Sequence, residues 1–169
     1  LIVKASDGSV RDSLSILDQA NIFKSQKEIQ VEEIVNMLGF ARQGDLYELS
    51  KCILDNNLSK LISMLDDMYQ RGSETSKIIE DMMNIINWSC KLKINQELIK
   101  DEFLTEEDKN FASYVIQFDS GKLNIFWQSL MKGYDEIKIS PQPHLTLEMV
   151  MLRCCLLYTS DAADDVRSV

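Results

Sequence analysis

The strongest chemical signal in this sequence is an arginine placed at the start of a predicted helix. Ser9 is a favoured N-cap residue, and Asp12 follows three positions later, as in a capping box. Val10 and Arg11 then become the first two helical residues. A helix N-terminus offers free backbone N–H groups and the positive end of the helix dipole, and a guanidinium can bind two phosphate oxygens at once. The spacing therefore predicts a phosphate-binding group at Arg11.

Two simpler interpretations compete with this one. Arg11 could be a solvated side chain paired with Asp12 or with another carboxylate. For Asp12 itself, capping is favoured over any role in nucleotide binding. On the opposite side of the same predicted helix, Leu14, Leu17 and Ala20 are expected to anchor it to a core.

The segment around this arginine also resembles a known motif. Residues 8–20, GSVRDSLSILDQA, are similar to the sensor-2 motif of the bacterial clamp-loader gamma/tau family of DNA polymerase III, roughly G-S-x-R-D-A-L-S-L-L-D-Q-A. The two departures are Ser13 and Ile16, where the family usually has alanine and leucine. Weaker similarity follows in residues 35–39, VNMLG, and in residues 145–153, LTLEMVMLR.

This resemblance implies a role in nucleotide sensing. In AAA+ ATPases of this kind, the sensor-2 arginine lies on the lid domain and contacts the γ-phosphate of ATP, so Arg11 is expected to be the ATP sensor. Mg²⁺ and most of the ATP site would be supplied by other parts of the parent protein. Since the sequence lacks a G-x-x-x-x-G-K-[ST] loop, these residues are not expected to hydrolyse ATP alone. No catalytic residue and no metal site are predicted.

The resemblance also implies partners and a location. Helical collar domains of several subunits, both identical and different, would pack into a ring that places a sliding clamp on primed DNA. Apart from the resemblance, no signal peptide or membrane-spanning run is visible, so the expected compartment is the cytoplasm, with no membrane association. Two alternatives remain: a helical interaction adaptor without nucleotide binding, and the lid region of another AAA+ motor.

Hydrophobic periodicity predicts an all-α fold. Residues 1–41 are expected to be the end of an AAA+ lid domain, and residues 42–155 a helical-bundle collar. The chain reads as a fragment. Residues 155–164, CLLYTSDAAD, resemble a translated sequencing adapter, which predicts that residues 156–169 are a non-native tail; a natural polar tail is the alternative. An irregular stretch is expected over residues 94–105, and helices are expected over residues 10–23, 31–38, 45–55, 59–71, 74–98, 105–118, 122–137 and 145–155.

Composition narrows the possible functions. The formal net charge of −9 argues against gripping DNA over a broad basic face. Hydrophobic residues make up 45% of the sequence, enough for a sizeable core, without a run of about 20 that could span a bilayer. The cysteines show no zinc-ligand spacing and are expected to be buried reduced thiols; they are Cys52, Cys90, Cys154 and Cys155.

A few other side chains merit attention. His144, between Pro143 and Leu145, is expected to be a loop histidine rather than a catalytic base. Glu148 and Arg153 are five apart and do not form a simple pair within one helix. The methionines Met82, Met83 and Met131 are expected to fill the core, as are Trp88 and Trp127. Any apolar surface left after the bundle closes would mark the assembly face, with Trp127, Met131 and Tyr134 as candidates.

Overall fold

The computed structural model describes residues 9–23, 28–30, 41–101 and 104–164, together with four isolated residues: Ile2, Ser6, Ile34 and Met37. Every regular element in these residues is a helix, as predicted. The elements are α2 (Val10–Phe23), α4 (Gln43–Leu54), α5 (Leu58–Gln70), α6 (Thr75–Ile94), the 3₁₀ helix η1 (Gln96–Lys100), α7 (Glu106–Val115), α8 (Ser120–Ile139) and α9 (Pro143–Asp164).

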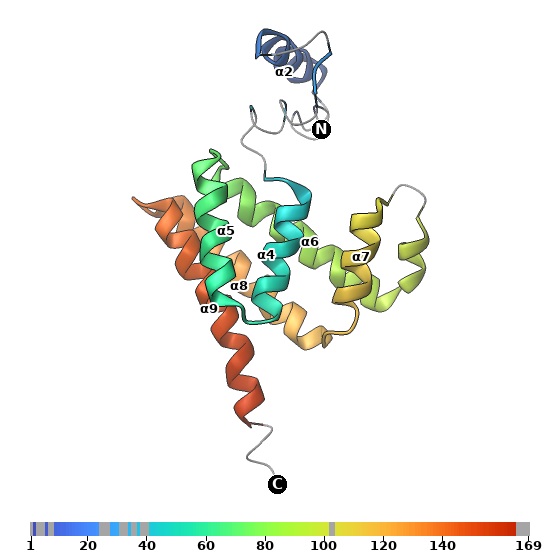
Figure 1. The fold of residues 1–169 in the computed structure, drawn as a ribbon, viewed down its shortest axis with the longest axis vertical. Coiled ribbons are helices and arrows are strands. Elements are labelled where there is room, and N and C mark those ends of the chain that lie inside the picture. Colours follow the sequence, from blue (N-terminus) through green and yellow to red (C-terminus); the bar gives the residue numbers. More distant parts are fainter. Residues whose placement is uncertain are drawn as a thin grey trace.

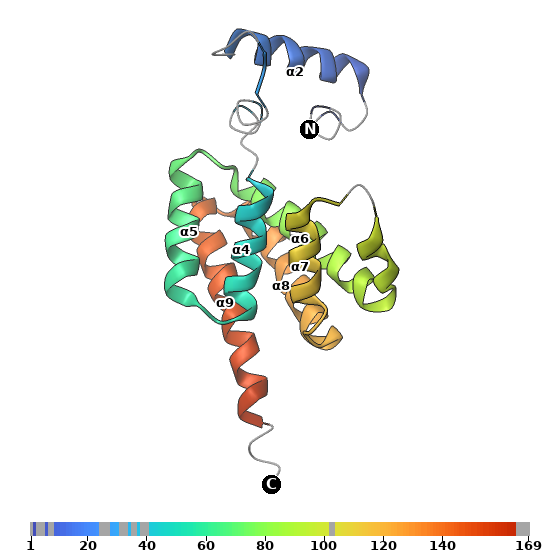
Figure 2. The same cartoon turned by 45° about the vertical axis from the view of Figure 1, so that its right-hand side comes forward.

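Helices α4 to α9 form one bundle, whereas α2 lies outside it (Figure 1). The most extensive contact in the bundle joins α6 to α8, followed by the contact between α8 and α9. Helix α9 also touches α4, α5 and α6. Its C-terminal half extends beyond the other helices, which the rotated view in Figure 2 shows as well.

The core of the bundle is apolar and tightly closed. Its largest fully buried side chains come from α4, α5, α6, α7 and α8, and they include Phe111, Phe126, Leu46, Leu49, Ile53, Leu61, Met68 and Met82. The ring of Phe111 on α7 stacks on that of Tyr47 on α4, with centroids 4.3 Å apart. Burial of these side chains supplies the main driving force for folding.

Two short turns connect α4 to α5 and α5 to α6 through residues with positive φ. Gly72 has φ of 80°, and the backbone N–H of Ser73 donates to the carbonyl of Met68 at 3.0 Å, which closes a Schellman motif. Asn56 has φ of 57° and occupies the corresponding position after α4. There the backbone N–H of Asn57 donates to the Cys52 carbonyl at 2.8 Å, which closes a second Schellman motif. The side chain of Asn57 then caps α5. Sharp reversals of this kind keep successive helices adjacent.

Helices α8 and α9 pack closely against each other at a glycine. Gly133 is buried, and a Cβ atom added there would overlap both methyl groups of Val150 on α9. A side chain as small as alanine would therefore push α8 and α9 apart.

Most helix boundaries agree with prediction to within two residues, but three helices differ by more. The helix expected over residues 105–118 ends at Val115. The helix expected over residues 74–98 ends at Ile94, and the chain continues as η1. The helix expected over residues 145–155 begins at Pro143 and continues to Asp164. The helix expected over residues 31–38 falls mostly outside the described residues, where only Ile34 and Met37 are seen, both helical. The status of residues 156–169 as a non-native tail stays a prediction.

Candidate functional site

The N-terminus of α2 has the cap that the sequence predicts. Ser9 precedes the first helical residue, Val10, and its Oγ accepts a hydrogen bond from the backbone N–H of Asp12 at 3.3 Å. This is the arrangement of an N-cap serine, which satisfies one of the free donors of the first turn. The positive end of the α2 dipole therefore lies at this serine.

Arg11 is the second residue of this helix, and its side chain is exposed to solvent. Among the carboxylates in the described ranges, none lies within ion-pair distance of its guanidinium. The pairing with Asp12, one of the partners that the simpler interpretation offered, is thus not formed. A solvated guanidinium one residue from a helix N-terminus, without a carboxylate partner among the described residues, can accept an incoming anion.

The reciprocal half of the predicted capping box is replaced by another contact. The backbone N–H of Ser9 donates to the carbonyl of Ser6 at 2.8 Å. In addition, the hydroxyls of Ser6 and Ser13 lie 2.6 Å apart, which ties the preceding residues to the first turn. Asp12 therefore contributes its N–H to the cap, and its negative charge favours the positive helix end.

The apolar face of α2 differs from prediction. Ala20 is buried, but Leu14 is 57% and Leu17 is 43% exposed, so these two leucines do not anchor the helix to a core. Val10, at 75% exposure, continues the same uncovered stripe. The spacing correctly identified one apolar face, but that face is not covered by the residues that the structure describes.

His144 lies in a helix rather than in the predicted loop. Pro143 is the first residue of α9, a position that suits proline because its missing N–H is not needed there. The imidazole is half-buried and stacks on the ring of Tyr69 from α5, with centroids 4.9 Å apart. This contact fixes the start of α9 against α5, consistent with a structural histidine.

The four cysteines are free thiols, as expected, and three of them are buried. Burial raises the pKa of Cys154 to about 12 and that of Cys155 to about 11. Cys90 is only half-buried. Within the described ranges, no group of three side chains is placed to hold a metal ion.

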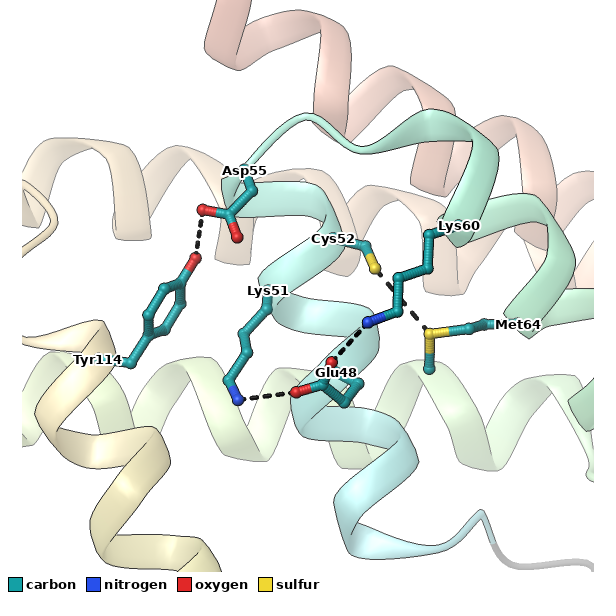
Figure 3. Close-up of polar contacts among 7 residues, drawn as sticks. All are labelled: Glu48, Lys51, Cys52, Asp55, Lys60, Met64 and Tyr114. Atoms are coloured by element: carbon teal, nitrogen blue, oxygen red, sulfur yellow. Dashed lines mark hydrogen bonds and ion pairs between the residues drawn. The ribbon is translucent and has the colours of Figure 1, made fainter.

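A polar network that sequence reasoning missed joins α4 to its neighbours (Figure 3). The Glu48 carboxylate accepts from Lys51 at 2.7 Å and from Lys60 of α5 at 2.8 Å. Hydrogen bonds from these two lysines lower the pKa of Glu48 despite partial burial. On the other side, the Tyr114 hydroxyl of α7 donates to Asp55 at 2.6 Å. Because its partners are up to 59 positions apart, no local spacing could have revealed the network.

A second contact joins α4 to the start of α7. The buried Tyr47 donates its hydroxyl to Asp108 at 2.6 Å, and the carboxylate of Asp108 also accepts from the N–H and hydroxyl of Thr105, the N-cap of α7. Thr105 and Asp108 thereby form a complete capping box at the start of α7. Tyr47 and Asp108 line a cleft of about 240 Å³ beside Trp88. Because both Asp108 oxygens already accept internal hydrogen bonds, this carboxylate serves the framework.

The aromatic and methionine candidates separate into different environments. Met82 is fully buried, and Met83, Trp88 and Trp127 pack against the core at its edge. Met131 is 45% exposed on α8, so its assignment as core filler is wrong. Tyr134, half-buried, donates its hydroxyl to Glu80 of α6 at 2.7 Å. Of the residues named as possible leftover apolar surface, Met131 fits best.

Arg153 finds its partner on another helix. Its Nη1 and Nη2 atoms donate to the two carboxylate oxygens of Glu136 on α8, at 3.1 and 2.9 Å. This bidentate geometry lowers the pKa of Glu136, through the hydrogen bonds first and the positive charge second. The prediction that Arg153 does not pair with Glu148 within α9 agrees with this arrangement.

None of the helices in the described part of the chain is long and apolar enough to cross a membrane.

Comparison with known families agrees with this architecture. Residues 29–168 match the family model described as DNA polymerase III subunits gamma and tau domain III. Residues 1–26, which include Arg11, match the model described as DNA polymerase III clamp loader subunit, ATPase lid domain.

Individual relatives are similar over most of this chain. The DNA polymerase III subunit tau of Bacillus subtilis is 29% identical over 164 residues, which cover 97% of this chain and 29% of that protein. The tau subunit of Salmonella typhimurium is 24% identical over 90% of this chain and 24% of its own length. That of Escherichia coli is 21% identical, also over 90% and 24%. The chain thus spans less than a third of these relatives.

Proposed function

The chain belongs to the family of DNA polymerase III gamma and tau subunits, and from this membership we propose that it links ATP sensing at Arg11 to assembly of the clamp loader. Residues 1–41 would act as the end of the lid domain, and residues 42–155 as the helical collar. The observation that carries the sensing role is a solvent-exposed guanidinium one residue from a capped helix N-terminus, within the segment that matches the lid. No carboxylate among the described residues pairs with it.

The residues around Arg11 fit the terminal phosphate of ATP. The terminal phosphate carries negative charge on its non-bridging oxygens, and the guanidinium would hold two of these oxygens at once. The positive end of α2, set by the Ser9 cap, would add to the attraction. Mg²⁺ and the phosphate-cradling loop would come from parts of the parent protein outside these residues.

The lid domain would convert nucleotide binding at Arg11 into movement relative to the ATPase module. If Arg11 contacts phosphate only when ATP is bound, nucleotide stabilises the state in which the lid lies close to the ATPase module. Loss of the terminal phosphate removes this differential contact, so the lid is released. Arg11 thereby acts as a positioning group for a conformational change, which the helices that follow would transmit to the assembly.

The collar would contribute assembly rather than DNA contact. The whole chain has a net charge of −9, and the collar contains most of its residues. A negatively charged surface repels a phosphate backbone, so the partners of the collar would be protein surfaces. We expect these partners to be other clamp-loader subunits, both identical and different, arranged in a ring. The complete loader would then place the sliding clamp on primed DNA in the cytoplasm.

Substitution of Arg11 in the full-length parent protein tests the sensing role. Arg11→Ala should weaken ATP-dependent clamp loading by about tenfold or more, because a charge-assisted bidentate contact is lost. Arg11→Lys keeps the positive charge but loses the bidentate geometry of the guanidinium. Its clamp loading should therefore lie between that of Arg11→Ala and that of the unsubstituted protein. Subunit assembly, measured by light scattering, should stay unchanged in both variants.

Arg42→Ala is the matched control, since Arg42 is also exposed at the start of a helix, and its side chain makes no capping hydrogen bond to α4. Its loading rate should equal that of the unsubstituted protein. Equal loading by Arg11→Ala and Arg42→Ala would reject the sensing role and favour a helical adaptor in which Arg11 is incidental.

A further inference from the structure

The first turn of α2, which carries Arg11, is tied to a buried serine outside the helix. Ser6 is only 5% exposed. Its carbonyl accepts a hydrogen bond from the backbone N–H of Ser9 at 2.8 Å, and its hydroxyl lies 2.6 Å from the hydroxyl of Ser13. Ser6 therefore contacts both ends of this turn, and Arg11 lies midway between those ends in the sequence.

The bond between the two hydroxyls joins the helix to the chain that precedes it. Its length of 2.6 Å is within the normal range for an O–H···O hydrogen bond. Because Ser6 is buried and Ser13 is half-buried, water competes less for these hydroxyls than for exposed ones. Ser13 is one of the two departures from the sensor-2 motif, so the motif itself does not supply this hydroxyl.

Other restraints on this turn are weak among the described residues. The first N–H groups of a helix lack partners within the helix, so helix ends open readily. The cap bond from the Asp12 N–H to the Ser9 hydroxyl is 3.3 Å long, which exceeds the usual 2.9–3.0 Å. Leu14 is exposed, so packing against the described core does not hold the turn in place. The contact with Ser6 therefore acts where few others do.

We propose that Ser13 is a positioning residue for Arg11. Its hydroxyl, bonded to Ser6, holds the first turn of α2 in the geometry that presents the guanidinium to a terminal phosphate. This inference rests on the sensing role proposed above. A turn that is ordered before the phosphate arrives loses less conformational entropy on binding, so the same contact yields a higher affinity.

The dependence of clamp loading on ATP concentration tests this role in the full-length parent protein. Ser13→Ala should raise the KM for ATP about three- to tenfold, the effect of one partly buried hydrogen bond, and leave kcat at saturating ATP nearly unchanged. Ser13→Thr keeps a hydroxyl and should restore most of the affinity for ATP. Ser15→Ala is the matched control, because Ser15 lies on the same helix with its side chain exposed. Equal KM values for Ser13→Ala and Ser15→Ala would overturn the proposal.

A double substitution separates positioning from a general effect on stability. A positioning residue acts only through the residue that it positions, so in an Arg11→Ala background Ser13→Ala should cause no further rise in the KM for ATP. If Ser13 merely stabilised the lid, its effect would persist without Arg11. Additive effects of the two substitutions would therefore contradict the proposal.

The ordering of the turn can be measured directly in the 169-residue chain. The N–H of Ser13 donates to the carbonyl of Ser9 at 2.9 Å, so the backbone amides of residues 13 and 14 report whether the first turn is closed. Ser13→Ala should lower their protection against hydrogen exchange about three- to tenfold, after correction for intrinsic rates, whereas Ser15→Ala should not. Unchanged protection in Ser13→Ala would overturn the proposal, because the hydroxyl would then order nothing.

Failure of this proposal can be told apart from failure of the proposed function. If Arg11→Ala weakens clamp loading and Ser13→Ala leaves the KM for ATP unchanged, the positioning role is rejected and the sensing role stands. If neither substitution changes clamp loading at any ATP concentration, both roles are rejected.

Discussion

Single side chains stabilise this protein where they bring charge or hydrogen bonds to a helix end. Thr105 and Asp108 at the start of α7, and Ser9 at the start of α2, could be predicted because capping depends on residues only three positions apart. The bond from Tyr47 to Asp108 could not be predicted, since its partners are 61 positions apart and meet only after the core forms.

The carboxylate of Asp108 should make stability depend on pH. Burial raises its pKa, but hydrogen bonds from Tyr47 and Thr105 outweigh burial and hold the pKa below the usual range. A lowered pKa in the folded state stabilises the protein above the unfolded pKa, near 4, and this stabilisation is lost as the pH falls through the folded pKa. We expect the free energy of unfolding, from urea titrations, to decrease below about pH 4.

Substitution of Tyr47 isolates the contribution of its hydrogen bond to Asp108. Tyr47→Phe keeps the stacking on Phe111 and removes one donor to a carboxylate, so it should cost about 1–2 kcal/mol at pH 7 and flatten the acid dependence. Tyr114→Phe removes a comparable hydroxyl bond to the exposed Asp55 and should cost less, about 0.5 kcal/mol. Equal losses in the two variants would show that burial of the acceptor does not matter.

The thiols should differ sharply in reactivity. Since burial raises the pKa values of Cys154 and Cys155 to about 12 and about 11, almost no thiolate exists at pH 8. Alkylation followed by mass spectrometry should modify the half-buried Cys90 first and reach the other two only after unfolding. Modification of Cys154 in the folded chain at the rate of Cys90 would mean that α9 detaches from the core.

Individual helices were predicted well in type and less well in extent. The apolar pattern of α6 continues to Leu98, which led the prediction past Ile94. Asn95 instead takes an extended conformation and caps η1 with its side chain, so a local hydrogen bond ends the helix there. For α9, the two nearby prolines indicate a loop by sequence alone, although the first helical position accepts proline readily.

The packing of α8 on α9 gives a direct test of helix contacts. Gly133→Ala should destabilise the chain by about 1–3 kcal/mol, because the added methyl group overlaps Val150. Adding Val150→Ala should recover part of this loss. Gly44→Ala is the control: its methyl group meets only the flexible end of Glu107, and alanine favours helix, so stability should stay equal or rise. A neutral Gly133→Ala in thermal unfolding would mean that α8 and α9 are not in close contact.

For the whole molecule, sequence periodicity was enough to predict an all-helical chain, and the motif around Arg11 was enough to suggest its family. Periodicity identified the apolar face of each helix but not what covers it. The exposed Leu14 and Leu17 on α2, and the exposed Met131 on α8, show this difference. An acidic surface with apolar stretches agrees with a part that binds proteins.

The most direct test of the account asks whether this chain assembles with a clamp loader. The purified 169-residue chain would be mixed with the other loader subunits of the same organism, and the mass of the product measured by size-exclusion chromatography with light scattering. We predict a stoichiometric complex that contains the chain and persists without ATP, because the collar supplies the contacts. A chain that elutes alone at micromolar concentration, while the intact parent subunit assembles under the same conditions, would contradict the account.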